Sequence, residues 1–206
     1  MLRCAAASSL ATSALSGGTA SRLMPSKFFK VMGIPDQEQL GLGQHRHRAG
    51  RPARIVAKFN ALTEPGLIEA LLAAGRAGVR IDLVVRGACL LPPGLPGVSE
   101  NIRVRSIVGR FLEHTRVLYF RWGEGDDEEA LYLSSADWMG RNMFGRIELA
   151  WPVRDAAARQ RVIDECLVPY LHDHQDAWQL LPDGRYERDG SDGPSAQQAL
   201  LRRFGG

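Results

Sequence analysis

Two β-branched runs that flank an amphipathic segment constrain the fold of this 206-residue chain more than any other feature. Residues 54–59 (RIVAKF) and 79–85 (VRIDLVV) each predict a short strand. Between them, Thr63 offers a helix N-cap, apolar residues recur at helical spacing over 67–72, and Gly78 supplies a C-terminal stop. A strand, helix, strand unit of this length predicts a right-handed crossover between parallel strands.

The rest of the chain alternates between shorter predicted strands and polar loops. Residues 87–97 (GACLLPPGLPG) predict a loop, at the end of a strand where open parallel sheets bind ligands. We therefore predict an α/β fold with a mixed sheet flanked by helices. The further elements expected are strands over 102–108, 114–120, 131–134 and 146–153, an acidic turn over 124–129, a closing helix over 155–172 and a short helix over 196–204.

Composition excludes several classes of protein. The chain is 45% hydrophobic and 24% charged, and 26 cationic residues nearly balance 23 acidic ones, which is typical of a soluble globular domain and not of a disordered polyelectrolyte. Three cysteines cannot form a disulfide framework, so a reducing, cytoplasmic location is expected. No apolar run is long enough to span a membrane, and peripheral membrane association stays open.

Arginine dominates the cationic residues, because only Lys27, Lys30 and Lys58 are lysines. Arginine suits bidentate recognition of phosphate and carboxylate groups. A genomic preference for arginine codons would give the same skew, so composition alone leaves both explanations open.

The amino-terminal quarter of the chain differs from the rest. Residues 1–23 are rich in alanine and serine and contain no acid, which is similar to an organelle transit peptide; a disordered leader is the other interpretation. Residues 24–50 have prolines and glycines without a period and predict a linker. We divide the chain into a leader and linker over 1–48, a domain over 49–178 and a polar tail over 179–206. An organelle is the alternative location.

His114 is the first candidate for chemistry, because arginines surround it in the sequence. These arginines are Arg103, Arg105, Arg110, Arg116 and Arg121. A neutral imidazole can attack phosphorus or shuttle a proton, and guanidinium groups neutralise the negative charge on transferred oxygens. The pattern predicts anion chemistry at His114, with a structural or surface histidine as the alternative.

A polar loop between two apolar strands is the second candidate. It contains Ser134, Ser135 and Asp137, followed by Arg141. Such a loop could orient the far nitrogen of a histidine and present hydroxyl and guanidinium groups to phosphate oxygens. A capped turn around a packed Trp138 is the alternative interpretation.

The remaining histidines and cysteines predict no metal site. Residues two apart, as in His45/His47 and His172/His174, face away from each other on a helix, and no cysteine cluster completes a site. Cys89 has no histidine near it in the sequence and is interpreted as a packed thiol.

Four segments resemble one known family. They are 54–62 (RIVAKFNAL), 77–87 (AGVRIDLVVRG), 93–120 (PGLPGVSENIRVRSIVGRFLEHTRVLYF) and 132–142 (YLSSADWMGRN). Together they are similar to the last catalytic domain of the long bacterial polyphosphate kinases, whose fold is one half of the phospholipase D-like fold. The resemblance covers about residues 49–178.

The resemblance implies roles for individual residues. Arg86 matches the family's ATP-binding arginine, and His114 matches its second active-site histidine, which contacts the nucleotide phosphates. Arg146 matches a basic residue of the polyphosphate tunnel, and Arg141 is a further candidate phosphate contact. The family moves the terminal phosphate of ATP onto polyphosphate through a phosphohistidine, reversibly and with Mg²⁺. ATP, ADP and polyphosphate are thus the implied partners, with no nucleic acid expected and with homo-oligomerisation left open.

The chain also departs from the family pattern. The family's phosphorylated histidine and magnesium-linked arginines lie in the preceding domain, and no segment here matches them. Pro92 stands where an arginine is expected, and Phe144 and Gly145 replace a more polar pair before Arg146. The expectation is a truncated fragment that keeps the nucleotide contacts, lacks the nucleophile and is not competent alone.

Two alternatives to a kinase fragment stay open. One is a module that only binds nucleotide or polyphosphate. The other is a phospholipase D-like nuclease whose two half-sites meet in a homodimer, although that superfamily has lysine where Arg116 stands.

Overall fold

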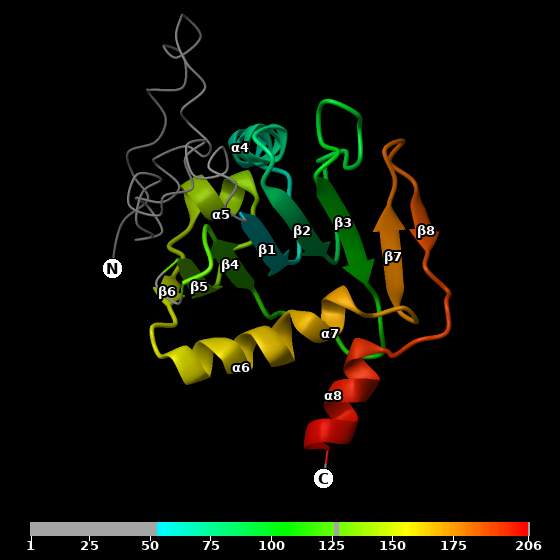
Figure 1. The fold of residues 1–206 in the computed structure, drawn as a ribbon. Coiled ribbons are helices and arrows are strands. Elements are labelled where there is room, and N and C mark those ends of the chain that lie inside the picture. Colours follow the sequence, from blue (N-terminus) through cyan, green and yellow to red (C-terminus); the bar gives the residue numbers. More distant parts are fainter. Residues whose placement is uncertain (1–52, 126–127, 206) are drawn as a thin grey trace, which may run out of the picture.

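An eight-stranded sheet organises the chain. The computed structural model describes residues 53–125 and 128–205, within which the strands lie in the order β6-β5-β4-β1-β2-β3-β7-β8 (Figure 1). The strands are β1 (Arg54–Phe59), β2 (Arg80–Val85), β3 (Ile102–Ile107), β4 (Val117–Arg121), β5 (Glu129–Ser134), β6 (Ala150–Pro152), β7 (Ala177–Leu180) and β8 (Tyr186–Arg188). The helices are α4 (Pro65–Arg76), α5 (Gly140–Gly145), α6 (Ala156–Cys166), α7 (Val168–Leu171) and α8 (Ala196–Phe204).

The centre of the sheet is parallel and its two sides are antiparallel. β1 pairs in parallel with β2, and β2 with β3, so that α4 forms the crossover from β1 to β2. β4, β5 and β6 add antiparallel strands beside β1, whereas β7 and β8 form an antiparallel pair beside β3. The predicted α/β class, with a mixed sheet flanked by helices, is confirmed.

Alternation along β1 separates the core into two layers. Ile55, Ala57 and Phe59 are buried in the cluster that also contains the apolar side of α4. Val56 belongs to a second cluster with Leu167 and part of α6. Because successive side chains of a strand point to opposite faces, one β-branched run supplies both layers of the core. Helices cover both faces of the central strands as a result (Figure 1).

The predicted crossover helix is present, but its N-cap is not the predicted residue. Glu64 caps α4, and its Oε2 atom accepts a 2.6 Å hydrogen bond from the Leu67 N–H. Thr63 lies one residue too early, and its N–H instead donates to the Trp138 carbonyl oxygen (2.9 Å). Proline at the first helical position fixes the start of α4. Gly78 has a φ of 93°, a left-handed conformation that ends the helix as predicted.

Three predicted elements differ from the structure in extent. The strand expected over 114–120 is β4, which begins at Val117 and leaves His114 in the preceding loop. The strand expected over 146–153 is the short β6, and α5 precedes it. The helix expected over 155–172 divides into α6 and α7 at Leu167, because Pro169 in the first turn of α7 has no N–H to donate to the preceding turn.

Residues after 178 continue the sheet. β7 includes residue 178, β8 pairs with β7, and α8 follows. The expected boundary between a domain and a polar tail therefore does not coincide with a break in the fold. The short helix predicted over 196–204 is confirmed as α8. The leader and linker over 1–48, with His45 and His47, lie outside the described residues. Within the described part of the chain, no helix is both long enough and apolar enough to cross a membrane.

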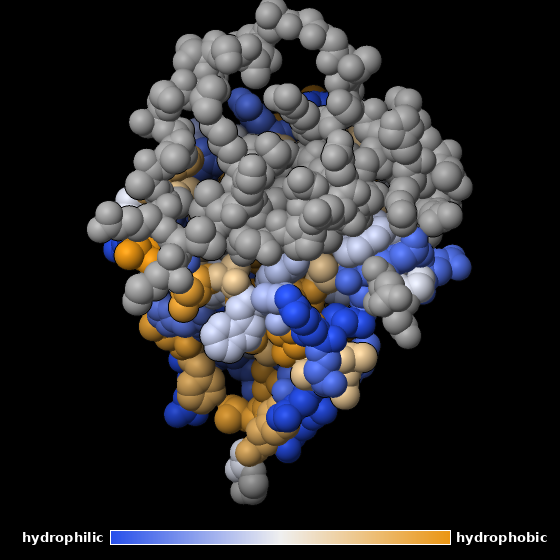
Figure 2. Space-filling view, turned by 90° about the vertical axis from the view of Figure 1, so that its left-hand side faces the viewer, coloured by the Kyte–Doolittle hydropathy of each residue, from blue (hydrophilic) through white to orange (hydrophobic). Residues whose placement is uncertain are grey.

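The side of the molecule that carries β6 exposes apolar side chains. Phe144, Ile147, Leu149 and Trp151 are each more than half exposed. Figure 2 shows this side, where hydrophobic and hydrophilic side chains lie next to each other. β6 is also an edge strand of the sheet, so its outer backbone groups have no neighbouring strand among the described residues.

Candidate functional site

The carboxyl ends of the parallel strands collect the residues that the sequence singled out for chemistry. Arg86 follows β2, and the loop that carries His114 joins β3 to β4. β4 is antiparallel to β1 with Val117 opposite Lys58, so β4 starts at the edge where β1 ends. β5 ends at the same edge, because Leu133 lies opposite Val117. The topology therefore brings the predicted loops to one edge of the sheet.

The ring of His114 is exposed, whereas its backbone is fixed by a hydrogen bond. Its carbonyl oxygen accepts a 3.1 Å hydrogen bond from Nη1 of Arg116, and its ring has no hydrogen-bond partner among the described residues. Arg86 lines one small pocket together with Glu113 and Thr115, the residues on either side of His114. The guanidinium of Arg86 likewise has no hydrogen-bond partner in the described part of the chain. The pocket thus places Arg86 beside the His114 segment.

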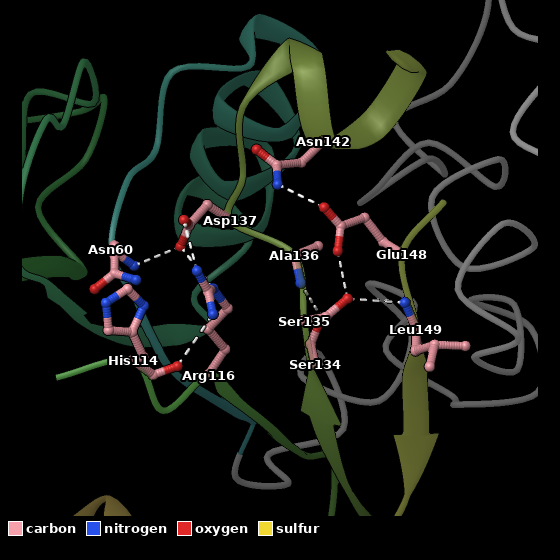
Figure 3. Close-up of polar contacts among 10 residues, drawn as sticks. All are labelled: Asn60, His114, Arg116, Ser134, Ser135, Ala136, Asp137, Asn142, Glu148 and Leu149. Atoms are coloured by element: carbon pink, nitrogen blue, oxygen red, sulfur yellow. Dashed lines mark hydrogen bonds and ion pairs between the residues drawn. The ribbon is translucent and has the colours of Figure 1, made fainter. Parts of the chain in front are cut away.

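Arg116 is bound by Asp137. Its Nε donates to Oδ1 of Asp137 at 2.9 Å, and its Nη2 donates to Oδ2 at 3.0 Å (Figure 3). The Asn60 N–H adds a 2.7 Å hydrogen bond to Oδ1. Burial acts to raise the pKa of Asp137, but the hydrogen bonds from Arg116 and Asn60 outweigh it and hold that pKa below its usual value. The hydrogen bond to Asp137 in turn raises the pKa of Arg116. The charge of Arg116 is therefore neutralised within the protein.

The two serines at the end of β5 close a turn. The hydroxyl of Ser134 accepts a 3.0 Å hydrogen bond from the Ala136 N–H. The hydroxyl of Ser135 donates to the Glu148 carboxylate and accepts a 2.9 Å hydrogen bond from the Leu149 N–H (Figure 3). The Ser134 hydroxyl thus caps its own turn, and the Ser135 hydroxyl holds the chain that enters β6.

The same loop buries Trp138. The indole is fully buried and stacks on Phe59, with ring centroids 4.5 Å apart. None of the hydrogen bonds of this loop in the described structure reaches the His114 ring, and Asp137 binds Arg116 instead. No contact in the described structure supports the interpretation that the loop orients the histidine, whereas the alternative, a capped turn around a packed Trp138, is present.

The other arginines near His114 in the sequence divide between structural and exposed positions. Arg105 is partly buried, and its Nη1 donates to the Leu171 carbonyl oxygen (2.6 Å) at the C-terminus of α7, where the helix dipole favours a cation. Arg121 lies at the opposite end of β4, where its Nε donates to the backbone of the following turn. Arg110 is exposed, with its guanidinium 5.6 Å from the Phe111 ring. Sequence proximity to His114 thus does not place these arginines around its ring.

α5 carries the two remaining candidates. Arg141 lies in its first turn and Arg146 is its C-cap, and both are exposed without a side-chain partner among the described residues. Met143 of the same helix packs into the cluster on the α4 side of the sheet. No contact in the described structure joins either arginine to His114 or Arg86, so α5 forms a separate basic position.

The sequence analysis missed a buried polar cluster next to the histidine. Lys58 is only 4% exposed, and its Nζ donates to Oε2 of Glu113 at 2.6 Å and lies 3.9 Å from the centroid of the Tyr170 ring. Oε1 of Glu113 accepts hydrogen bonds from the Tyr170 hydroxyl (2.8 Å) and from Nε2 of Gln197 (3.0 Å). One signal could have found it, because Lys58 interrupts an apolar run in a strand whose two faces are covered.

The cluster keeps Glu113 ionised. Burial acts to raise the pKa of Glu113, but the hydrogen bond and the charge of Lys58, with the hydrogen bonds from Tyr170 and Gln197, outweigh it. The pKa of Glu113 therefore lies below its ordinary value of 4.5. Burial, followed by the hydrogen bond to Glu113, raises the pKa of Tyr170. A neutral tyrosine hydroxyl is thus the donor to a charged carboxylate.

Metal ligands do not gather in the described part of the chain, where no group of three or more histidine, cysteine or acidic residues could hold an ion. Nδ1 of His172 lies 2.9 Å from a carbonyl oxygen of its own helix, whereas Nδ1 of His174 lies 3.1 Å from Oδ2 of Asp189. Cys89 packs against the main core, and burial raises its pKa. It is a packed thiol, as predicted.

The fold and the site define a class of protein: an α/β domain that presents a histidine ring and a guanidinium at the carboxyl ends of parallel strands, where such sheets bind ligands. A family model described as "Polyphosphate kinase C-terminal domain 2" matches residues 37–199. The chain belongs to the polyphosphate kinase family.

Two polyphosphate kinases that resemble the chain agree with the family match. The polyphosphate kinase of Burkholderia multivorans is 56% identical over 159 residues, which are 76% of this chain and 23% of that protein. The crystal structure of polyphosphate kinase from Porphyromonas gingivalis has 31% sequence identity and a TM-score of 0.75, over 87% of this chain and 30% of that chain. A phospholipase D family member, Nuc from Salmonella typhimurium, has 16% identity and a TM-score of 0.36 over 52% of this chain and 72% of that one. The chain spans about a quarter of the length of the curated relatives it matches.

Proposed function

We propose that this chain is the carboxyl-terminal catalytic portion of a polyphosphate kinase and that it binds the phosphate groups of ATP and polyphosphate at the carboxyl edge of β1, β2 and β3. One observation carries the proposal: Arg86, whose guanidinium has no hydrogen-bond partner in the described structure, lines one small pocket together with Glu113 and Thr115, the residues on either side of His114. Family membership supplies the substrates, and a cytoplasmic location, where ATP is abundant, suits the role.

Arg86 and His114 differ from the cations around them because no carboxylate among the described residues is paired with them. Lys58 and Arg116 lie at the same edge, but each is paired with a carboxylate inside the protein. Among the described residues, nothing takes up the guanidinium donors of Arg86, so they can bind a phosphate group in a bidentate manner. The His114 ring can place one nitrogen against a phosphate oxygen. These two side chains are therefore assigned to the nucleotide phosphates.

The chemistry expected of these residues is positioning and charge stabilisation. Transfer of the terminal phosphate of ATP spreads negative charge over the phosphate oxygens, and fixed donors that meet this charge lower the barrier. Arg86 would offset charge on the nucleotide phosphates, while His114 would hold a phosphate oxygen in place. Neither role requires His114 to become phosphorylated.

Magnesium would enter with ATP. The carboxylates beside the site, Glu113 and Asp137, are already bound by Lys58 and Arg116, and the described residues contain no cluster of metal ligands. The donor set of the described chain therefore does not fit a magnesium site of its own.

The two arginines of α5 are assigned to the polyphosphate chain. Arg141 and Arg146 are exposed and unpartnered in the described structure, and no contact links them to His114. A long polyanion gains binding energy from each exposed cation along its path, whereas a nucleotide reaches only the nearest ones. Substitution of either arginine is therefore expected to weaken polyphosphate binding more than ATP binding.

Affinity measurements on the full chain test the nucleotide site. Arg86→Ala and His114→Ala are each expected to weaken binding of MgATP by roughly tenfold to a hundredfold, because each removes a hydrogen bond to a charged phosphate. Isothermal titration calorimetry gives the dissociation constants directly.

Arg76→Ala is the matched control. Arg76 is an exposed arginine in the last turn of α4, next to the start of β2 and hence at the opposite edge of the sheet. Its substitution is expected to leave the affinity for MgATP unchanged. Wild-type affinity in both Arg86→Ala and His114→Ala would refute the assignment.

A further inference from the structure

We propose that Gln197 of α8 and Glu113 form a clamp that holds the segment carrying His114 in its binding position. The two residues are positioning residues, because they act on the ligand through His114. The inference rests on the proposed function only in taking His114 as the group that meets phosphate.

Gln197 holds the backbone of the segment from one side. Its Oε1 accepts a 2.9 Å hydrogen bond from the Phe111 N–H, and its Nε2 donates to the Phe111 carbonyl oxygen at 2.9 Å and to Oε1 of Glu113 at 3.0 Å. Gln197 is 6% exposed, so water has little access to replace these bonds. One side-chain amide thus satisfies both backbone groups of a loop residue, as a neighbouring strand would.

Glu113 connects the same segment to two further elements. Lys58 in β1 donates to its Oε2 at 2.6 Å, and Tyr170 in α7 donates to its Oε1 at 2.8 Å. Together with Gln197, three donors from three separate elements converge on one carboxylate. His114 is the next residue in the chain, so its backbone starts from a fixed point.

α8 is itself anchored, so the clamp has a firm base. The fully buried carboxylate of Asp173 accepts a 2.7 Å hydrogen bond from the Ala196 N–H in the first turn of α8. Ser195, the N-cap of α8, donates to Oδ2 of Asp176 at 2.7 Å. Gln197 therefore extends from a helix start that is tied to the loop between α7 and β7.

The other side of His114 is held independently. Its carbonyl oxygen accepts a hydrogen bond from Arg116, which Asp137 fixes in place. The backbone of His114 is thus held before and after the residue, while its ring stays without a partner among the described residues. A ring on a preorganised backbone loses little conformational freedom when it meets a phosphate, which favours binding and catalysis.

A double-mutant cycle on the full 206-residue chain tests the clamp. Gln197→Met keeps the length of the buried side chain and removes all three hydrogen bonds; Gln198→Met, at the exposed neighbour on the same helix, is the matched control. Gln197→Met is expected to raise the dissociation constant for MgATP about tenfold, and Gln198→Met to leave it unchanged. In a His114→Ala background the effect of Gln197→Met is expected to vanish.

Tyr170→Phe provides a second, milder variant, because it removes only the hydroxyl donor to Glu113 and keeps the buried ring. Its expected effect on MgATP affinity has the same direction and also disappears in the His114→Ala background. Wild-type affinity in Gln197→Met and Tyr170→Phe, or equal losses with and without the His114 ring, would overturn the clamp.

Amide hydrogen exchange separates failure of the clamp from failure of the proposed function. The amides of residues 111–115 are expected to exchange faster in Gln197→Met than in wild type or Gln198→Met. If His114→Ala binds MgATP with wild-type affinity, the proposed function fails and the clamp is judged on exchange alone. Faster exchange at residues 111–115 then supports the clamp, and unchanged exchange overturns it.

Discussion

A cation at the edge of the sheet can meet a ligand only if no carboxylate of the protein already binds it. Arg116 and His114 are two residues apart, yet Asp137 neutralises Arg116 while the His114 ring has no partner in the described structure. Lys58 is more deeply buried than either and is paired with Glu113. A count of positive charge in the sequence around His114 therefore overstates the charge that a phosphate would meet. The pairs stiffen the site, and the groups without a partner in the described structure are the ones proposed to bind.

Asp137→Asn tests the stiffening role of one pair. The amide oxygen can still accept the Asn60 N–H, so the loss reports on the charged, two-point contact with Arg116. We expect the free energy of unfolding to fall by about 2 kcal/mol, which urea denaturation measures. A cycle with Arg116→Met completes the test, since additive losses in the double variant would show that the two side chains do not interact.

Acid is expected to destabilise the protein through Glu113. Its pKa in the folded state lies below the ordinary value of 4.5, so the unfolded chain binds the proton more readily. The stabilisation is present above the unfolded pKa and is lost as the pH falls through the folded pKa. Urea denaturation from about pH 6 to about pH 3 is expected to show this loss.

Glu113→Gln separates this carboxylate from the other acids. It is expected to lower stability at neutral pH, because the buried ammonium of Lys58 loses its counter-charge. It is also expected to flatten the acid limb of the stability profile, because the side-chain amide of the variant does not titrate. An acid limb as steep as that of the wild type would exclude Glu113 as a source of the pH dependence.

The central elements could be predicted because each has a strong local pattern of its own. β1 and β2 are β-branched runs, and α4 repeats its apolar residues at helical spacing. β7 and β8 have four and three residues with mixed polarity, and β7 is defined by its pairing with β3, where Gln179 lies opposite Arg105. Such a strand has no local signal, since its stability comes from the neighbour that it joins.

The candidate site likewise contains some residues that a local sequence pattern indicates and others that it does not. Arg86 follows a recognisable strand and His114 lies close to another, although the sequence alone placed His114 at the start of that strand and not in the loop before it. Glu113 is joined to Lys58 and Gln197 across 55 and 84 positions of sequence, and no local pattern encodes such contacts. The residues that hold the histidine segment therefore became visible only with the fold.

Ser195→Ala tests how firmly α8 is attached. The hydroxyl of Ser195 accepts from the Gln198 N–H and donates to Asp176, so alanine removes both an N-cap and a contact with the loop before β7. We expect a loss of about 1 kcal/mol in the free energy of unfolding, measured in urea. Gln198→Ala, on the exposed face of the same helix, serves as the control and should change stability little. Equal stability of Ser195→Ala and wild type would mean that the hydroxyl of Ser195 does not help to hold α8.

On the scale of the whole molecule, the edge that is proposed to bind phosphate presents one free histidine ring among the described residues, that of His114. His172 and His174 have partners within the described structure, one on its own helix and one on Asp189. The chain spans about a quarter of the length of its curated relatives, and the resemblance assigns the phosphorylated histidine to the preceding domain of those enzymes. Because His114 is proposed to contact phosphate oxygens and not to attack phosphorus, binding of ATP and phosphorylation of His114 are expected to be separate in this chain.

Labelling with γ-³²P-ATP and Mg²⁺ tests that separation. The purified chain is expected to bind ATP but to acquire no acid-labile, alkali-stable phosphate, because His114 contacts the nucleotide phosphates without attacking phosphorus in the proposed role. The polyphosphate kinase of Burkholderia multivorans, labelled in parallel, is the control for the labelling conditions, because the resemblance implies a phosphohistidine in that family. Labelling of this chain that disappears in His114→Ala would make His114 the nucleophile itself, and the positioning role proposed for it would then have to be abandoned.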